Sequence, residues 1–64
     1  MKGIDPLIIT NLLPSNGYNV VEFSRAPRYV RKKQLEELGG YISVDTIWNF
    51  PKNVTREQIE RAIA

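Results

Sequence analysis

GYNVVEFSRAPRYVRKKQLEEL, residues 17–38, and YISVDTIWNFPKNVTREQIERA, residues 41–62, follow the same pattern when the chain is shifted by 24 residues. Each stretch reads as an apolar strand, a loop marked by a proline and a cation, and a short amphipathic helix. Five pairs of positions are identical: Val20 with Val44, Pro27 with Pro51, Val30 with Val54, Gln34 with Gln58, and Glu36 with Glu60. We therefore predict an approximate 24-residue strand-loop-helix duplication, with repeat one over residues 17–40 and repeat two over residues 41–64.

Repeat two shows the pattern most clearly. Apolar and polar residues alternate over residues 41–48, which predicts one half-buried strand with Ile42 and Val44 facing the core. Thr55 stands where its side chain can cap the following helix, and Gln58 can return the hydrogen bond in a capping box. The sequence therefore predicts a well-defined start for the last helix.

Repeat one keeps the same plan but lacks this cap. Residues 18–23 predict the strand, and Gly39 and Gly40 are typical of a helix end. The position of Thr55 is taken by Arg31, whose side chain cannot accept a hydrogen bond from the N–H groups of the first turn. We expect this helix to begin with unsatisfied N–H groups and a cluster of cations.

The N-terminal segment, residues 6–13, is compatible with a strand or a helix. Asp5 followed by Pro6 is a typical helix start. Against this, Pro-Ser-Asn-Gly at residues 14–17 is typical of a hairpin turn, and a hairpin adds a strand that a sheet in so small a domain needs. We therefore predict an α+β domain of order ββαβα, with αβαβα as the alternative. Both helices should cover one face of the sheet and leave the other face open.

Size and composition argue against catalysis. The 64 residues suffice for one small domain, residues 1–64, and contain no cysteine or histidine, which removes thiolate metal sites and the commonest nucleophiles and bases. The carboxylates show no acid–base or metal-binding spacing. An enzyme that used the arginines with Glu22 or Asp45 would have no motif behind it. We expect no enzymatic activity, no cofactor and no metal.

The strongest chemical signal is a cluster of cations. The net charge is only +2, yet residues 25–33 carry five cations and no anion. The residues concerned are Arg25, Arg28, Arg31, Lys32 and Lys33, with Tyr29 among them. A basic loop that leads into an uncapped helix N-terminus suits phosphate groups, and an aromatic ring can add stacking. The alternative is a solvated loop, partly neutralised by Lys32 with Glu36 and Lys33 with Glu37.

Repeat two extends this hypothesis. Lys52 and Arg56 stand at the positions of Arg28 and Lys32, so the two loops could form a paired basic surface that holds two phosphates. Trp48 and Phe50 lie beside the second loop, where exposed rings would stack on bases or anchor a protein partner. The alternative is that these rings belong to the core and that each cation is only a polar residue beside a helix.

Two functions fit these observations. The leading hypothesis is a small non-enzymatic nucleic-acid-binding or regulatory domain that contacts phosphates through the basic loop and the helix N-terminus. The alternative is a protein-interaction module: an adaptor, a subunit or inhibitor of a larger protein, or a homo-oligomer that shares the open sheet face. No apolar stretch is long enough to span a bilayer, so we expect a cytoplasmic location and no membrane partner.

Overall fold

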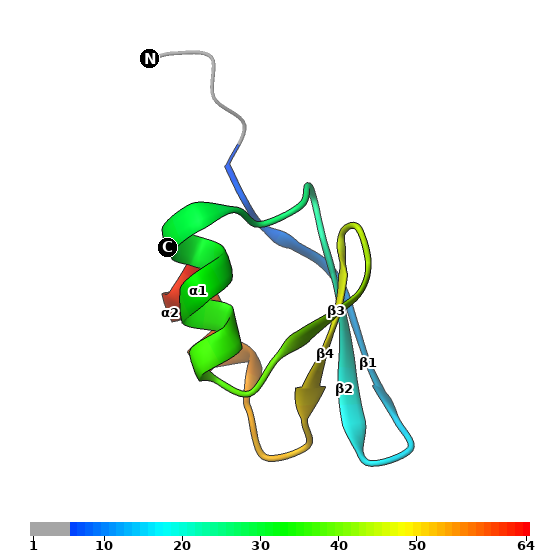
Figure 1. The fold of residues 1–64 in the computed structure, drawn as a ribbon. Coiled ribbons are helices and arrows are strands. Elements are labelled where there is room, and N and C mark those ends of the chain that lie inside the picture. Colours follow the sequence, from blue (N-terminus) through cyan, green and yellow to red (C-terminus); the bar gives the residue numbers. More distant parts are fainter. Residues whose placement is uncertain (1–5) are drawn as a thin grey trace.

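The computed structural model describes residues 6–64, which form a four-stranded antiparallel sheet and two helices (Figure 1). The elements are, in chain order, β1 (Ile9–Ser15), β2 (Tyr18–Phe23), α1 (Tyr29–Glu37), β3 (Tyr41–Val44), β4 (Ile47–Pro51) and α2 (Arg56–Ile63). The predicted α+β class is confirmed, and the N-terminal segment is a strand, as the predicted ββαβα order has it; the last predicted strand is present as a pair of strands, so the full order is ββαββα. Asp5 lies outside the described residues.

The first hairpin forms at the predicted turn. Asn16 and Gly17 link β1 to β2 with backbone φ angles of 50° and 82°, and Ser15 pairs with Tyr18 across the turn. A two-residue turn with two positive φ angles matches the twist of the flanking strands, and Asn followed by Gly is the sequence that adopts it most readily. The turn therefore fixes the register of β1 against β2.

The strand predicted over residues 41–48 is wrong in one respect, because the chain turns at Asp45 and Thr46 and makes a second hairpin. The sheet order is β1-β2-β4-β3, so β4 lies between β2 and β3 and is paired on both sides. The break moves Val44 to the face opposite the core, where 58% of it is exposed, and leaves Ile42 partly exposed on edge strand β3. A central strand is better protected from water, and β4 carries the large apolar side chains that need this protection.

The duplication is present in the fold with a different unit and spacing. The chain passes twice through a hairpin followed by a helix, first as β1-β2-α1 and then as β3-β4-α2. The starts of β2 and β4 are 29 residues apart (18 and 47), and the starts of α1 and α2 are 27 apart (29 and 56). The predicted shift of 24 residues is therefore not the spacing of the structural repeat.

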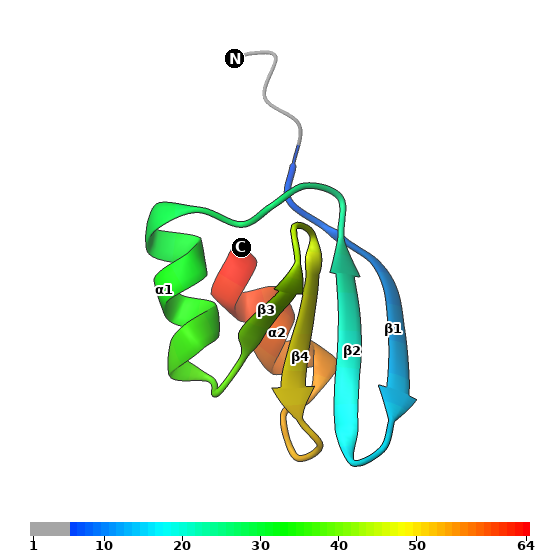
Figure 2. The ribbon, with the colours of Figure 1, turned by 45° about the vertical axis from the view of Figure 1, so that its right-hand side comes forward.

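Both helices cover one face of the sheet, as the two views show (Figures 1 and 2). The space between the layers is filled by side chains from all but β3: Leu7, Ile9, Val21, Phe23, Leu35, Trp48, Phe50, Val54, Ile59 and Ile63. Trp48 and Phe50 stack with their ring centroids 6.0 Å apart. Burial of these apolar surfaces is the main term that holds the helices on the sheet. Neither helix is long and apolar enough to cross a membrane.

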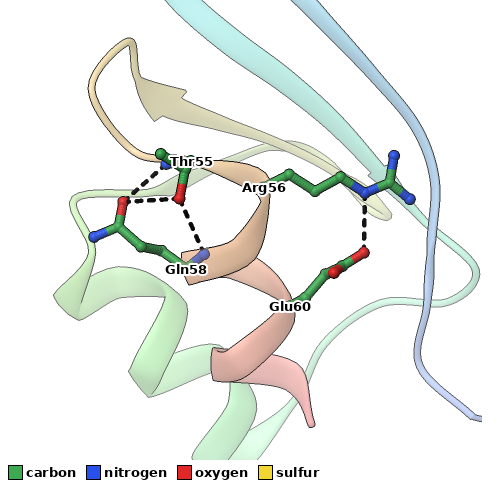
Figure 3. Close-up of polar contacts among 4 residues, drawn as sticks. All are labelled: Thr55, Arg56, Gln58 and Glu60. Atoms are coloured by element: carbon green, nitrogen blue, oxygen red, sulfur yellow. Dashed lines mark hydrogen bonds and ion pairs between the residues drawn. The ribbon is translucent and has the colours of Figure 1, made fainter.

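The helix ends follow local sequence signals, with one correction. Thr55 Oγ1 accepts a hydrogen bond from the Gln58 N–H (3.2 Å), and Gln58 Oε1 accepts one from the Thr55 N–H (2.8 Å), which confirms the capping box (Figure 3). Helix α1 ends at the predicted glycines, where the Gly40 N–H donates to the Leu35 carbonyl (3.1 Å). However, α1 begins earlier than the repeat predicts, with Arg28 rather than Arg31 as its N-cap.

Candidate nucleic-acid interface

Four of the predicted phosphate-binding residues line one open groove at the start of α1. They come from the end of the loop that follows β2 and from the first two turns of the helix: Arg28, Tyr29, Lys32 and Lys33. The other walls are Ala26, Pro27, Glu36, Ile42 and Asp45, of which the last two belong to the β3-β4 hairpin. We call these residues together the basic groove.

The three cations of the basic groove stand at the start of α1. Lys32 follows Arg28 by four residues and so lies about one turn further along the helix, and Lys33 is next to Lys32 in the chain. The Arg28 backbone is extended (φ −139°, ψ 159°), no side chain caps the helix, and the first turn holds no acidic residue. The positive end of the helix dipole therefore adds to the cationic side chains.

Tyr29 has an unusual conformation at the entrance of this helix. Its φ is +57°, a region that a bulky residue adopts only at a cost in energy, and 86% of the residue is exposed. The exposure shows that the tyrosine ring is not part of the core. The ring is therefore free to contact a ligand in the basic groove.

The charges of the basic groove are mixed. Arg28, Lys32 and Lys33 share it with the carboxylates of Glu36 and Asp45. The pairs that the alternative of a solvated loop placed between Lys32 and Glu36 and between Lys33 and Glu37 are not formed. The ion pair found within residues 6–64 joins Arg56 Nε to Glu60 Oε2 at 2.9 Å (Figure 3). The three cations of the basic groove are therefore available to an anion.

The other two cations of the loop lie outside this groove. Arg31 Nε donates a hydrogen bond to the carbonyl oxygen of Ile63 at 3.0 Å, which ties the start of α1 to the end of α2. Arg25 is exposed in the loop that follows β2, but it is not among the groove residues. Arg31 therefore has a structural contact that the sequence did not indicate.

The predicted paired basic surface is wrong, because Lys52 and Arg56 lie away from the basic groove. Lys52 lies beside the β1-β2 turn, and Arg56 lines a depression with Leu7 and Glu60. Helices α1 and α2 run in opposite directions along the sheet, so their first turns are at opposite ends of the domain (Figure 1). A sequence repeat does not reveal this reversal.

Trp48 and Phe50 are not exposed stacking groups. Both are fully buried, with 0% of each residue accessible, because alternation along β4 turns them towards the helices. The Trp48 Nε1–H is buried without a hydrogen-bond partner among the described residues. The prediction that these rings anchor a partner is therefore corrected, and the core alternative holds.

Sequence reasoning missed the contribution of the second hairpin. Ile42 and Asp45 reach the basic groove because the chain reverses at Asp45, whose φ is +37°. Aspartate is common in turns, so its position within the apparent strand was a signal for this reversal. Glu22, by contrast, lies on the face of the sheet that is turned away from the helices. Residues 6–64 contain no group of three acidic, histidine or cysteine side chains that could hold a metal ion.

Comparisons with known proteins do not assign the chain to a family. No protein-family model matches the chain, and no curated protein or solved structure matches it at a significant level.

Proposed function

We propose that the chain is a small non-enzymatic nucleic-acid-binding domain that contacts phosphate groups through the basic groove. The observation that carries this proposal is the convergence of Arg28, Lys32 and Lys33 at one uncapped helix N-terminus beside the exposed ring of Tyr29. Backbone N–H groups, the helix dipole and the side chains all favour an anion there. The ring can stack on a base next to the bound phosphate.

The number of cations sets the expected salt dependence. Three groove cations that each displace one counterion give a slope of log affinity against log salt of about −2 for a single strand and about −3 for a duplex. Glu36 and Asp45 repel phosphates and so limit the contact to the edge formed by the cations. The footprint is therefore a few nucleotides, with modest affinity.

Fluorescence anisotropy with short labelled DNA and RNA, at low and physiological salt, tests this proposal. The Lys32→Ala variant should weaken binding and reduce the salt slope by about one unit. Lys52→Ala is the matched control, because it removes the same charge beside the β1-β2 turn. Equal effects of the two variants, or no binding at low salt, would overturn the proposal.

A protein-interaction module is the second candidate, and the outer face of the sheet favours it. Leu13, Tyr18, Tyr41 and Val44 are all close to half exposed or more on that face. Exposed apolar surface of this kind commonly marks a contact with another protein. An adaptor, subunit or inhibitor would use this face and leave the basic groove to attract an acidic partner.

A further inference from the structure

The face of the sheet turned away from the helices carries an ordered set of apolar side chains. The strand register arranges its residues in three rows across the sheet: Asn11, Glu22, Ile47 and Val44; Leu13, Val20, Asn49 and Tyr41; and Ser15, Tyr18 and Pro51. We call these residues the outer sheet face. Tyr18 and Tyr41 meet edge to face across β4, with their ring centroids 6.4 Å apart.

The charges of the outer sheet face are unsuited to nucleic acid. Glu22 is its one charged residue, and none of its positions is a lysine or arginine. Phosphate groups would meet a carboxylate and apolar side chains there, with no cation on the face itself to replace the displaced ions. These side chains favour a largely apolar protein surface over nucleic acid.

We propose that the outer sheet face binds a second copy of this chain and forms a two-fold symmetric dimer. A carboxylate on this face and a lysine at its border are placed so that two copies of the chain complement each other. Glu22 stands in the row at one end of the strands, and Lys52 follows Pro51 of the row at the other end. A two-fold axis that runs across the strands places Glu22 against Lys52 of the partner subunit, twice per dimer.

The centre of the face fits the same axis. Asn49 lies in the middle row, and its side-chain amide can donate and accept at once, so it can pair with Asn49 of the partner subunit. Leu13, Val20 and Tyr41 of the same row then pack against their own counterparts, as in two aligned sheets about 10 Å apart. A two-fold axis parallel to the strands would instead bring the two Glu22 carboxylates together.

The size of the face predicts a weak dimer. Four strands spaced by about 4.8 Å make a face about 19 Å wide, and its length is similar. Such a contact falls below the roughly 1,200 Å² of total buried area found in stable interfaces. We therefore expect a weak dimer that forms only in concentrated solution.

Sedimentation equilibrium of the full chain, from low micromolar to millimolar concentration, tests the proposal. The average mass should rise from the monomer value of 7.4 kDa towards twice that value. Val44→Lys should raise the dissociation constant at least about tenfold, because a charge replaces buried apolar surface in both copies. Val30→Lys is the matched control, because Val30 is 67% exposed on α1 and Val44 is 58% exposed on the outer sheet face. A monomer at every concentration, or equal effects of the two variants, would overturn the proposal.

Charge exchange separates this dimer from pairing between the exposed edges of β1 or β3. Glu22→Lys should weaken the dimer several-fold, and the double variant Glu22→Lys with Lys52→Glu should restore it. Edge pairing would leave both variants like the native chain, because Glu22 lies on central strand β2. Thermal unfolding of each variant establishes that the monomer is still folded, and a failure of the double variant to recover would contradict the proposed axis.

Discussion

Arg31 Nε donates a hydrogen bond to the carbonyl oxygen of Ile63, and this 3.0 Å contact joins the first turn of α1 to the last turn of α2. The last carbonyl groups of a helix have no partner within it and carry the negative end of its dipole. The Arg31 guanidinium group donates a hydrogen bond to one of these carbonyl groups and places a positive charge at the negative end of the dipole. The contact therefore gives Arg31 a structural role at the end of α2.

Replacing Arg31 should lower stability rather than ligand affinity. Arg31→Ala removes a charge-assisted hydrogen bond, and we expect a loss of about 1 to 2 kcal/mol in the free energy of unfolding, measured with urea. Arg28→Ala is the control, because the structure gives the Arg28 side chain no hydrogen bond within residues 6–64. If the two variants unfold at the same urea concentration, the Arg31 contact contributes nothing.

Tyr29 should lower the stability of the fold through its strained backbone and raise the affinity for nucleic acid through its ring. A glycine accepts the φ of +57° without strain, so Tyr29→Gly should be about 1 kcal/mol more stable than Tyr29→Ala, which keeps the strain. Both variants lose the ring and should weaken nucleic-acid binding to a similar extent, by about 1 to 3 kcal/mol if the ring stacks on a base. Unchanged affinity in both would show that Tyr29 is not part of the binding surface.

Because of the capping box at the start of α2, two substitutions of Thr55 should reduce the free energy of unfolding by different amounts. Thr55→Ala removes the acceptor of the Gln58 N–H and should cost about 1 kcal/mol, whereas Thr55→Ser keeps the hydroxyl and should cost little. Chemical denaturation monitored by circular dichroism measures both. Equal losses for alanine and serine would point to the methyl group of Thr55 instead of its hydrogen bond.

Two glycines should differ in their tolerance of a side chain. A Cβ atom at Gly40 would lie 2.4 Å from Phe50 Cε1, within the core, so Gly40→Ala should cost about 3 kcal/mol or prevent folding. Gly17 has open space around it and only its φ of +82° to constrain it, so Gly17→Ala should cost about 1 to 2 kcal/mol. A larger loss at Gly17 than at Gly40, measured by thermal unfolding, would contradict this packing.

Trp48→Phe should cost less than the loss of an indole usually does. The variant gives up buried apolar area, but it also removes an N–H group that is buried without a partner among the described residues. The two effects oppose each other, so we expect a net loss below about 2 kcal/mol, against about 3 to 5 kcal/mol for Trp48→Ala. Equal losses in the two variants would mean that the phenyl ring retained in Trp48→Phe contributes no packing energy.

Features that depend on a few neighbouring residues can be predicted from the sequence alone. The hairpin turn at Asn16 and Gly17, the capping box of Thr55 and Gln58, and the helix end at Gly39 each arise from the preferences of adjacent residues. The basic loop was also evident, because its charges are consecutive in the chain. Such signals are readable because their energies do not require any distant segment to be in place.

The way in which these segments meet depends on packing across the whole chain. Packing between the sheet and the helices placed β4 in the centre, buried Trp48 and divided the predicted second strand at Asp45. The opposite directions of α1 and α2 separated Lys52 from the basic groove and brought Arg31 to Ile63. These outcomes depend on which arrangement buries the most apolar surface across the whole chain, and no alignment of one stretch with another contains that information.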